Sequence, residues 1–232
     1  MLGQPKLVVG VLSDTHLPYR LASLPPAILH IFHGVDLILH AGDVDESAFL
    51  APLREIAPIY AVRGNIHLGD FSSGGKELPN EVELTLRGYK IVVTHGHRPG
   101  LIGWLLKVPE IILSDYLSKL WYNPLNNQIA KRLHKRYPDA DVVIFGHTHA
   151  PYARRVGKTL FFNPGGVAPN KEGLTSVGLL RFWADRVEPL IIPLGDGWQK
   201  KLGLVLPVSR AMEPVRPQAV DPEARGKQHD PR

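Results

Sequence analysis

The 232-residue chain contains no cysteine, which excludes disulfide bridges, cysteine-based zinc sites and catalysis by a thiol. Long apolar runs are also missing. No stretch approaches the roughly 18 consecutive apolar residues of a spanning helix, and the apolar run at residues 7–12 is too short for the core of a signal peptide. These absences lead us to expect a cytoplasmic protein with no membrane partner.

What is present is an ordinary globular composition, with 44% hydrophobic and 21% charged residues, which suffices to bury a core without covalent cross-links. The net charge of +5 favours anionic ligands only weakly. A nucleic-acid arm would need a denser basic block with aromatic platforms, so we do not expect nucleic acid as a partner.

Short apolar runs alternate with helix-like stretches through the first two thirds of the chain, and strands dominate the last third. This order favours one α/β domain at residues 1–206, followed by a proline-rich, disordered tail at 207–232. The predicted helices are residues 25–32 and 46–56. The predicted strands are residues 7–12, 37–40, 59–62, 82–86, 91–94, 142–145, 152–156, 159–162, 176–183 and 187–192.

A long connection at residues 98–140 reads as a helical insertion. Two trios recur at i, i+4 and i+8, a spacing that puts each trio on one helix face. The trios are Ile112, Tyr116 and Leu120, and Leu125, Ile129 and Leu133. We favour a helical layer that covers the sheet over a lid or a dimer surface, although the exposed aromatic residues allow a homodimer.

Polar side chains follow five of the predicted strands. In a sheet of this kind, ligands bind beyond the carboxyl ends of the strands, where such side chains converge. Seven of these residues offer oxygen or nitrogen donors, which without thiolate suit Mn²⁺, Fe, Zn²⁺, Ni²⁺ or Co²⁺. Seven donors are too many for one ion but match two ions if one carboxylate bridges them. Two such ions can hold an ionised water molecule and position a phosphoryl group for in-line attack. The seven donors are Asp14, His16, Asp43, Asn65, His95, His147 and His149.

The motifs Asp-x-His, Gly-Asp, Gly-Asn, His-Gly-His and Gly-His-x-His follow one another in this order. The set resembles the calcineurin-like metallophosphoesterase superfamily, and most of all its small prokaryotic branch of YfcE-type phosphodiesterases, over about residues 6–192. The resemblance implies two mixed β-sheets packed face to face with helices outside, a four-layer αββα fold. It also implies a binuclear centre at which a metal-bridging hydroxide attacks phosphorus in line.

The resemblance also assigns roles to individual residues. Asp14, His16 and His149 would bind one ion. Asn65, His95 and His147 would bind the other, and Asp43 would bridge the two. His97 stands where the superfamily has a second histidine beside the phosphate.

The loop after the third strand departs from the pattern of that branch. The branch has Gly-Asn-Cys-Asp, whereas this chain has Ile66 and His67 after the Gly-Asn pair. We hypothesise that His67 donates a proton to the departing alkoxide, although it could also orient a ligand or face solvent. Arg63 could contact phosphate or pair with a carboxylate.

Other polar residues have simpler interpretations. His40 ends an apolar run, and we expect it to be buried and hydrogen-bonded, supporting the site without touching metal. Asp45 is most simply a loop cap, and Asn163-Pro164-Gly165-Gly166 a tight turn. The leading functional prediction is a phosphodiesterase that acts on a small phosphoester such as a nucleotide. The alternatives are a non-catalytic metal-binding scaffold of the Vps29 kind and a nuclease.

Overall fold

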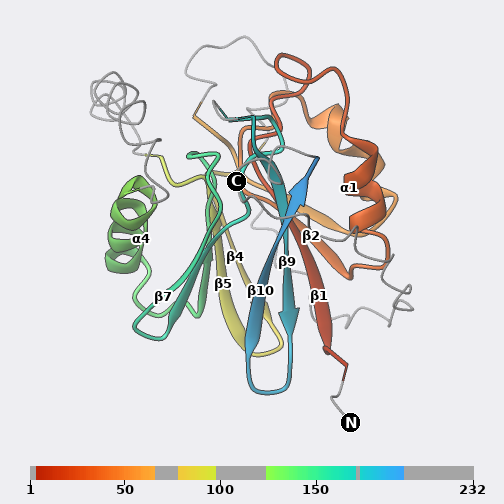
Figure 1. Ribbon diagram of the computed structural model, residues 1–232. Helices are drawn as coiled ribbons and strands as arrows, with labels where there is room; N and C mark the ends of the chain where they lie inside the picture. Colours follow the sequence, from red (N-terminus) through yellow and green to blue (C-terminus); the bar gives the residue numbers. More distant parts are fainter. Residues whose placement is uncertain (1–3, 66–77, 98–123, 171–172, 196–232) are drawn as a thin grey trace, which may run out of the picture.

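The computed structural model describes residues 4–65, 78–97, 124–170 and 173–195, which contain two five-stranded sheets that pack against each other (Figure 1). Sheet A has the strand order β10 (Val187–Leu194), β9 (Thr175–Phe182), β1 (Leu7–Leu12), β2 (Leu37–His40) and β3 (Ile59–Ala61). Sheet B has the order β4 (Glu81–Leu86), β5 (Tyr89–Thr94), β6 (Val142–Ile144), β8 (Thr159–Asn163) and β7 (Tyr152–Val156).

Both sheets are mixed, and each has three parallel strands. In sheet A, the neighbouring strands β1, β2 and β3 are parallel, β9 runs antiparallel to β1, and β10 runs antiparallel to β9. In sheet B, β5, β6 and β8 are parallel, while β4 and β7 run antiparallel. The carboxyl ends of six parallel strands, three from each sheet, therefore carry the loops from which a site can be built.

The two sheets share one apolar core because alternate strand residues face the opposite sheet. Val11 and Leu39 of sheet A and Val93 and Phe162 of sheet B are all fully buried in this cluster. Face-to-face packing of two mixed sheets is thus confirmed.

Helices cover the outer face of each sheet. On sheet A, α1 (Pro26–Ile31) and α2 (Ala51–Arg54) bury Ile28 and Leu53, and Phe32 packs against Gly10, which has no side chain to obstruct it. On sheet B, α4 (Pro124–Arg136) buries Ile129 and Leu133 in a cluster with strand residues. The result is the expected αββα order of layers.

Most elements match the sequence-based predictions to within one or two residues. The predicted helix at 46–56 instead forms two short pieces, the 3₁₀ helix η1 (Ser47–Leu50) and α2. Pro52 explains the break, because proline has no N–H for an α-helical hydrogen bond to the preceding turn. The helix predicted from Leu125, Ile129 and Leu133 is α4.

Several predictions fall outside the described residues: the trio Ile112, Tyr116 and Leu120, the tail at 207–232, and His67. Among the described residues, no helix is both long and apolar enough to cross a membrane.

Candidate metal centre

The predicted site residues that the structure describes follow the carboxyl ends of parallel strands. Asp14 and His16 follow β1, Asp43 follows β2, and Asn65 follows β3. From sheet B, His95 and His97 follow β5, and His147 and His149 follow β6. The donors are thus divided between the two sheets, and contacts between them cross from one sheet to the other.

The backbone at this site adopts a conformation that side-chain-bearing residues seldom adopt. Seven non-glycine residues among those described have positive φ, and only Arg87, in the β4–β5 turn, lies elsewhere. The other six are Asp14, His16, Asp43, Asp45, His147 and His149. Left-handed backbone costs about 1–2 kcal/mol per residue and persists where surrounding contacts enforce it. Strain concentrated in this way is typical of a functional site.

Two glycines are required in this site because their backbone passes very close to the side chains of the donors or of their neighbours. A Cβ atom on Gly64 would lie 1.7 Å from Oδ1 of Asp43, and one on Gly146 would lie 1.8 Å from Oγ of Ser13, whose hydroxyl donates to Asp14. Any side chain at either position would push a candidate ligand carboxylate out of place.

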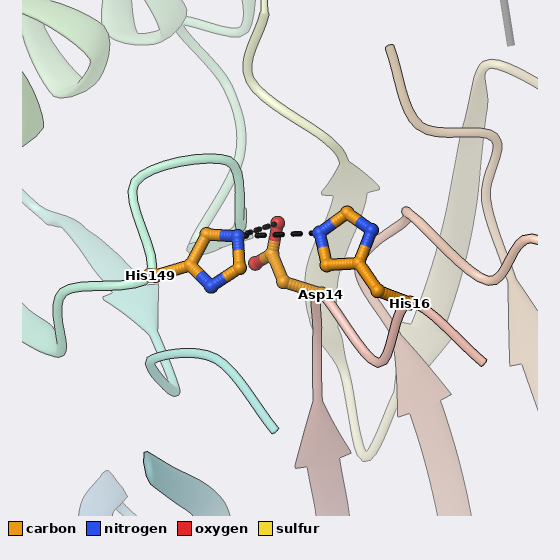
Figure 2. A group of neighbouring side chains, drawn as sticks. All are labelled: Asp14, His16 and His149. Carbon is orange, nitrogen blue, oxygen red and sulfur yellow. Dashed lines mark hydrogen bonds and ion pairs between the residues drawn. The ribbon is translucent and has the colours of Figure 1, made fainter. Parts of the chain in front are cut away.

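The first donor group consists of Asp14, His16 and His149, with one ligand atom from each within 4.8 Å of the others. Figure 2 shows the three side chains directed toward one another. Nε2 of His149 lies 3.6 Å from Oδ1 of Asp14 and 3.2 Å from Nε2 of His16. One carboxylate oxygen and two imidazole nitrogens make a donor set suited to a first-row divalent ion.

The second donor group consists of Asp14, Asp43 and His95, again within 4.8 Å. Oδ1 of Asn65 extends it, because it lies 2.8 Å from Nε2 of His95 and 3.1 Å from Nδ1 of His147. Asp14 therefore belongs to both groups, whereas the superfamily pattern gives it to one ion.

Asp43, a member of the second group, also lies beside His16 of the first group. Its Oδ2 is 3.5 Å from Nε2 of His16 and 3.4 Å from Nε2 of His95. Its Oδ1 accepts a hydrogen bond of 2.9 Å from the backbone N–H of Asn65. An oxygen at nearly equal distances from one nitrogen of each group has the position that a bridging carboxylate requires.

Backbone carbonyls orient two of the histidines. Nδ1 of His95 lies 2.8 Å from the carbonyl oxygen of Ala41, and Nδ1 of His149 lies 3.1 Å from that of Ala168. Each Nδ1 therefore carries a proton and donates it to the carbonyl oxygen, and each Nε2 faces the donor groups. Bonds of this kind fix the tautomer and orientation of metal-ligating histidines.

Asp45 supports His16 from the other side and is a residue that the sequence did not reveal as part of the site. Its carboxylate is buried, with Oδ2 3.8 Å from Nδ1 of His16. The loop-cap interpretation of Asp45 therefore missed its place beside a candidate ligand. The only sequence signal is its position two residues after Asp43.

The charges of the donors are strongly coupled. Burial alone would lower the pKa of His95, but the carboxylates of Asp43 and Asp14 raise it above its ordinary value. Burial alone would raise the pKa of Asp43, but His95, followed by His16, lowers it. Burial lowers the pKa of His147 to about 3. Asp43 and His95 therefore stabilise each other's charges, whereas burial keeps His147 neutral at pH 7.

His40 has the supporting role expected of it. It is fully buried, its Nδ1 accepts a hydrogen bond of 3.2 Å from the Gly42 N–H, and its Nε2 lies 3.2 Å from Oγ1 of Thr15. Burial, followed by the charge of His95, lowers its pKa to about 3, so His40 is neutral at pH 7. It thereby fixes the loop between His40 and Asp43.

His97 and Arg63 lie at the edge of the donor groups. The half-buried ring of His97 has its centroid 5.5 Å from that of His95 and 6.4 Å from that of His147. Burial, followed by the charge of His95 and smaller effects of Arg132 and Arg63, lowers its pKa to about 4. Arg132, from α4, is a second residue near the site that sequence patterns did not identify.

Residues 7–184 match the sequence profile of the calcineurin-like phosphoesterase superfamily domain. The chain is 30% identical over 191 residues to a probable metallophosphoesterase of Methanothermobacter thermautotrophicus, covering 82% of this chain and 94% of that protein. It is 31% identical over 190 residues to one of Methanocaldococcus jannaschii, covering 82% and 83%. Its fold is similar to that of Vps29 from Cryptosporidium parvum, with a TM-score of 0.60, 21% identity, and coverage of 82% of this chain and 92% of that one.

Proposed function

This chain belongs to the calcineurin-like phosphoesterase superfamily, and we propose that it is a divalent-metal-dependent phosphodiesterase. The observation that carries the proposal is the convergence of carboxylate and imidazole donors into two adjoining groups, with Asp43 beside a histidine of each. A donor set of this kind fits Mn²⁺, Fe, Zn²⁺, Ni²⁺ or Co²⁺, and Mn²⁺ is the ion that we propose first.

The proposed ligands divide as follows. Asp14, His16 and His149 hold one ion, and Asn65, His95 and His147 hold the other, while Asp43 is shared. When bound, two divalent ions supply the positive charge that lowers the pKa of a water molecule and neutralises the phosphoryl oxygens. The remaining steps concern residues of the chain.

We assign His97 to binding a phosphoryl oxygen. Its Nδ1 is buried and has no hydrogen-bond partner among the described residues, so a substrate oxygen can supply that partner. Arg63 adds positive charge on the same side, which favours an anionic substrate. Asn65 binds the substrate in addition to serving as a ligand of the second ion.

His67 is the proposed proton donor to the leaving group, and it lies outside the described residues. A poor leaving group needs a proton more than a good one does. His67→Ala should therefore slow hydrolysis of a methyl phosphodiester far more than that of a p-nitrophenyl phosphodiester. Equal slowing of both substrates, or none, would contradict the acid role.

The proposed function is tested with chelator-treated protein reloaded with each ion in turn. We expect hydrolysis of bis(p-nitrophenyl) phosphate and of nucleotide diesters with Mn²⁺, no turnover in chelator, and slower hydrolysis of p-nitrophenyl phosphate. Asp43→Asn should abolish most of the turnover because it removes the shared carboxylate. Failure of every ion to support hydrolysis of any of these substrates would overturn the proposal.

A second candidate, a non-catalytic scaffold, is favoured by the similarity of the fold to Vps29. The scaffold hypothesis differs from the phosphodiesterase hypothesis in one measurable way: the protein would bind the ions but hydrolyse no diester. A nuclease would instead cleave DNA or RNA, with binding that weakens steeply as the salt concentration rises.

A further inference from the structure

Helix α4 contacts two loops that carry candidate metal ligands, residues 95–97 and 146–150, which we call the histidine loops. Asn126, Ile129 and Arg132 are spaced three residues apart and lie along one face of the helix. Contacts from this face reach both loops, although β5 and β6, which precede the loops, are far apart in the sequence.

Asn126 connects α4 to the second histidine loop. Its side chain is 1% exposed, its Nδ2 donates to the carbonyl oxygen of Ala150 at 3.0 Å, and its Oδ1 accepts from the hydroxyl of Thr148 at 2.8 Å. Thr148 lies between His147 and His149, so this pair of hydrogen bonds fixes the backbone that carries both ligands.

Thr148 is also held by a residue of sheet B, Asn163. Its Oγ1 accepts from Nδ2 of Asn163 at 3.0 Å, and that same Nδ2 donates to the carbonyl oxygen of Gly146 at 2.9 Å. Asn163 is fully buried at the end of β8. Asn126 and Asn163 therefore both hold the loop, each through the Thr148 hydroxyl and one backbone carbonyl.

Arg132 connects the same helix to the first histidine loop. Its guanidinium donates to the carbonyl oxygen of Gly96, between His95 and His97. Ile129 packs on the same glycine, since a Cβ atom there would lie 3.3 Å from Cγ2 of Ile129. Both the polar and the apolar contacts of α4 thus converge on the backbone next to candidate ligands.

We propose that α4 is a positioning element of the metal centre, in which Asn126 and Arg132 fix the relative positions of the two histidine loops. The inference rests on the proposed function. Ligands bind an ion tightly only when they are held within about 0.5 Å of the required geometry. His147 and His149 both have positive φ, a conformation that relaxes unless other bonds maintain it.

The test uses variants of single side chains in the full-length protein. Thr148→Val removes the hydroxyl at nearly constant volume, and Asn126→Ala removes its partner on α4. Thr148→Ser keeps the hydroxyl and should restore binding. Asn127→Ala is the matched control, because Asn127 is the next residue of the helix but accepts a hydrogen bond of 2.8 Å from Tyr152 of β7 instead.

Two quantities are measured for each chelator-treated variant: the dissociation constant for Mn²⁺ by calorimetry and the unfolding midpoint without metal. We expect Thr148→Val and Asn126→Ala to bind Mn²⁺ about 10- to 100-fold more weakly than the wild type. Thr148→Ser and Asn127→Ala should bind it with the wild-type affinity. The metal-free unfolding midpoint should fall further in Asn126→Ala, which loses two hydrogen bonds of a buried side chain, than in Asn127→Ala. Recovery of Mn²⁺ affinity in Thr148→Ser relative to Thr148→Val therefore separates positioning from general stability.

The inference is overturned if Thr148→Val and Asn126→Ala bind Mn²⁺ as tightly as the wild type, or if Asn127→Ala loses as much affinity as Asn126→Ala. If Thr148→Val does not fold, the comparison of Asn126→Ala with Asn127→Ala decides the matter. A wild-type protein that binds none of Mn²⁺, Fe, Zn²⁺, Ni²⁺ and Co²⁺ contradicts the proposed function itself, whereas normal binding by the wild type and by Asn126→Ala contradicts only the role of α4.

Discussion

The imidazole rings of His16 and His149 are stacked, with their planes 5° from parallel and their Nε2 atoms 3.2 Å apart. Nδ1 of His149 faces a carbonyl oxygen, so its Nε2 presents a lone pair. Two imidazole nitrogens brought this close stabilise each other only if a proton or a cation lies between them. The pair is therefore prepared for a positive charge.

The first prediction removes half of this pair. His149→Ala should reduce the number of Mn²⁺ ions bound per chain from about two to about one, because only the group around His95 keeps its donors. Metal analysis after gel filtration measures the stoichiometry. His33→Ala, which removes an exposed histidine, should leave it unchanged. Retention of both ions by His149→Ala would exclude this assignment.

A second prediction concerns the carboxylate behind His16. Asp45→Asn keeps the size of the side chain but removes the charge that supports the ring, and it should weaken Mn²⁺ binding by about tenfold. Calorimetric titration measures the change. Asp141→Asn is the control, since the carboxylate of Asp141 accepts a hydrogen bond from the Lys90 N–H away from the candidate ligands. Equal affinities of Asp45→Asn and the wild type would contradict a supporting role.

A third prediction follows from the close contact between Gly64 and Asp43. Gly64→Ala should displace the Asp43 carboxylate and abolish tight binding of at least one ion, because the new methyl group and Oδ1 cannot occupy the same space. Gly88→Ala introduces a methyl group at a positive φ with no atom within 4 Å. That control should lose about 1–2 kcal/mol of stability from backbone strain and still bind both ions; similar metal binding by Gly64→Ala would refute the steric argument.

A fourth prediction concerns the acid stability of the metal-free protein. His40 has a pKa of about 3 in the folded protein, against an ordinary value of 6.5, so the unfolded chain binds the proton first as the pH falls. The stability that neutral His40 gives the folded protein is fully present above pH 6.5. As the pH falls from 6.5 toward 3, the free energy of unfolding decreases by about 1.4 kcal/mol per pH unit for this one proton.

The measurement is the free energy of unfolding against pH in the presence of a chelator. His40→Gln should make the loss of stability between pH 6.5 and 4 less steep, because one buried titrating group is gone. His33→Gln should keep the wild-type slope because His33 is exposed. His97 and His147, whose pKa values are also lowered, account for part of the remaining slope. An unchanged slope in His40→Gln would contradict this prediction.

Sequence patterns predicted the sheets well because buried strands have a local signature. The β-branched and aliphatic runs that became β1, β2 and β6 are buried on both faces, so every residue in them is apolar or nearly so. The short helical pieces after β2 were harder to predict, because Pro52 allows a helix to begin but not to continue through it.

The donors of the candidate site were also predictable, since they directly follow strands in a fixed order. Of the residues that support them, only His40 was predicted. Asp45, Asn126 and Arg132 act through contacts with residues distant in the sequence, and no local pattern distinguishes Asn126 from Asn127. The place of Asp14 in both donor groups likewise depends on how the two sheets pack, which residue spacing does not encode.

One consequence follows from the division of the donors between the sheets. Asp14, His16, Asp43 and Asn65 move with sheet A, whereas the histidines after β5 and β6 move with sheet B. Sliding of one sheet over the other would therefore alter every distance across the proposed centre at once. The apolar interior, through side chains such as Leu39 and Phe162, thus fixes the spacing between the two halves of the proposed centre.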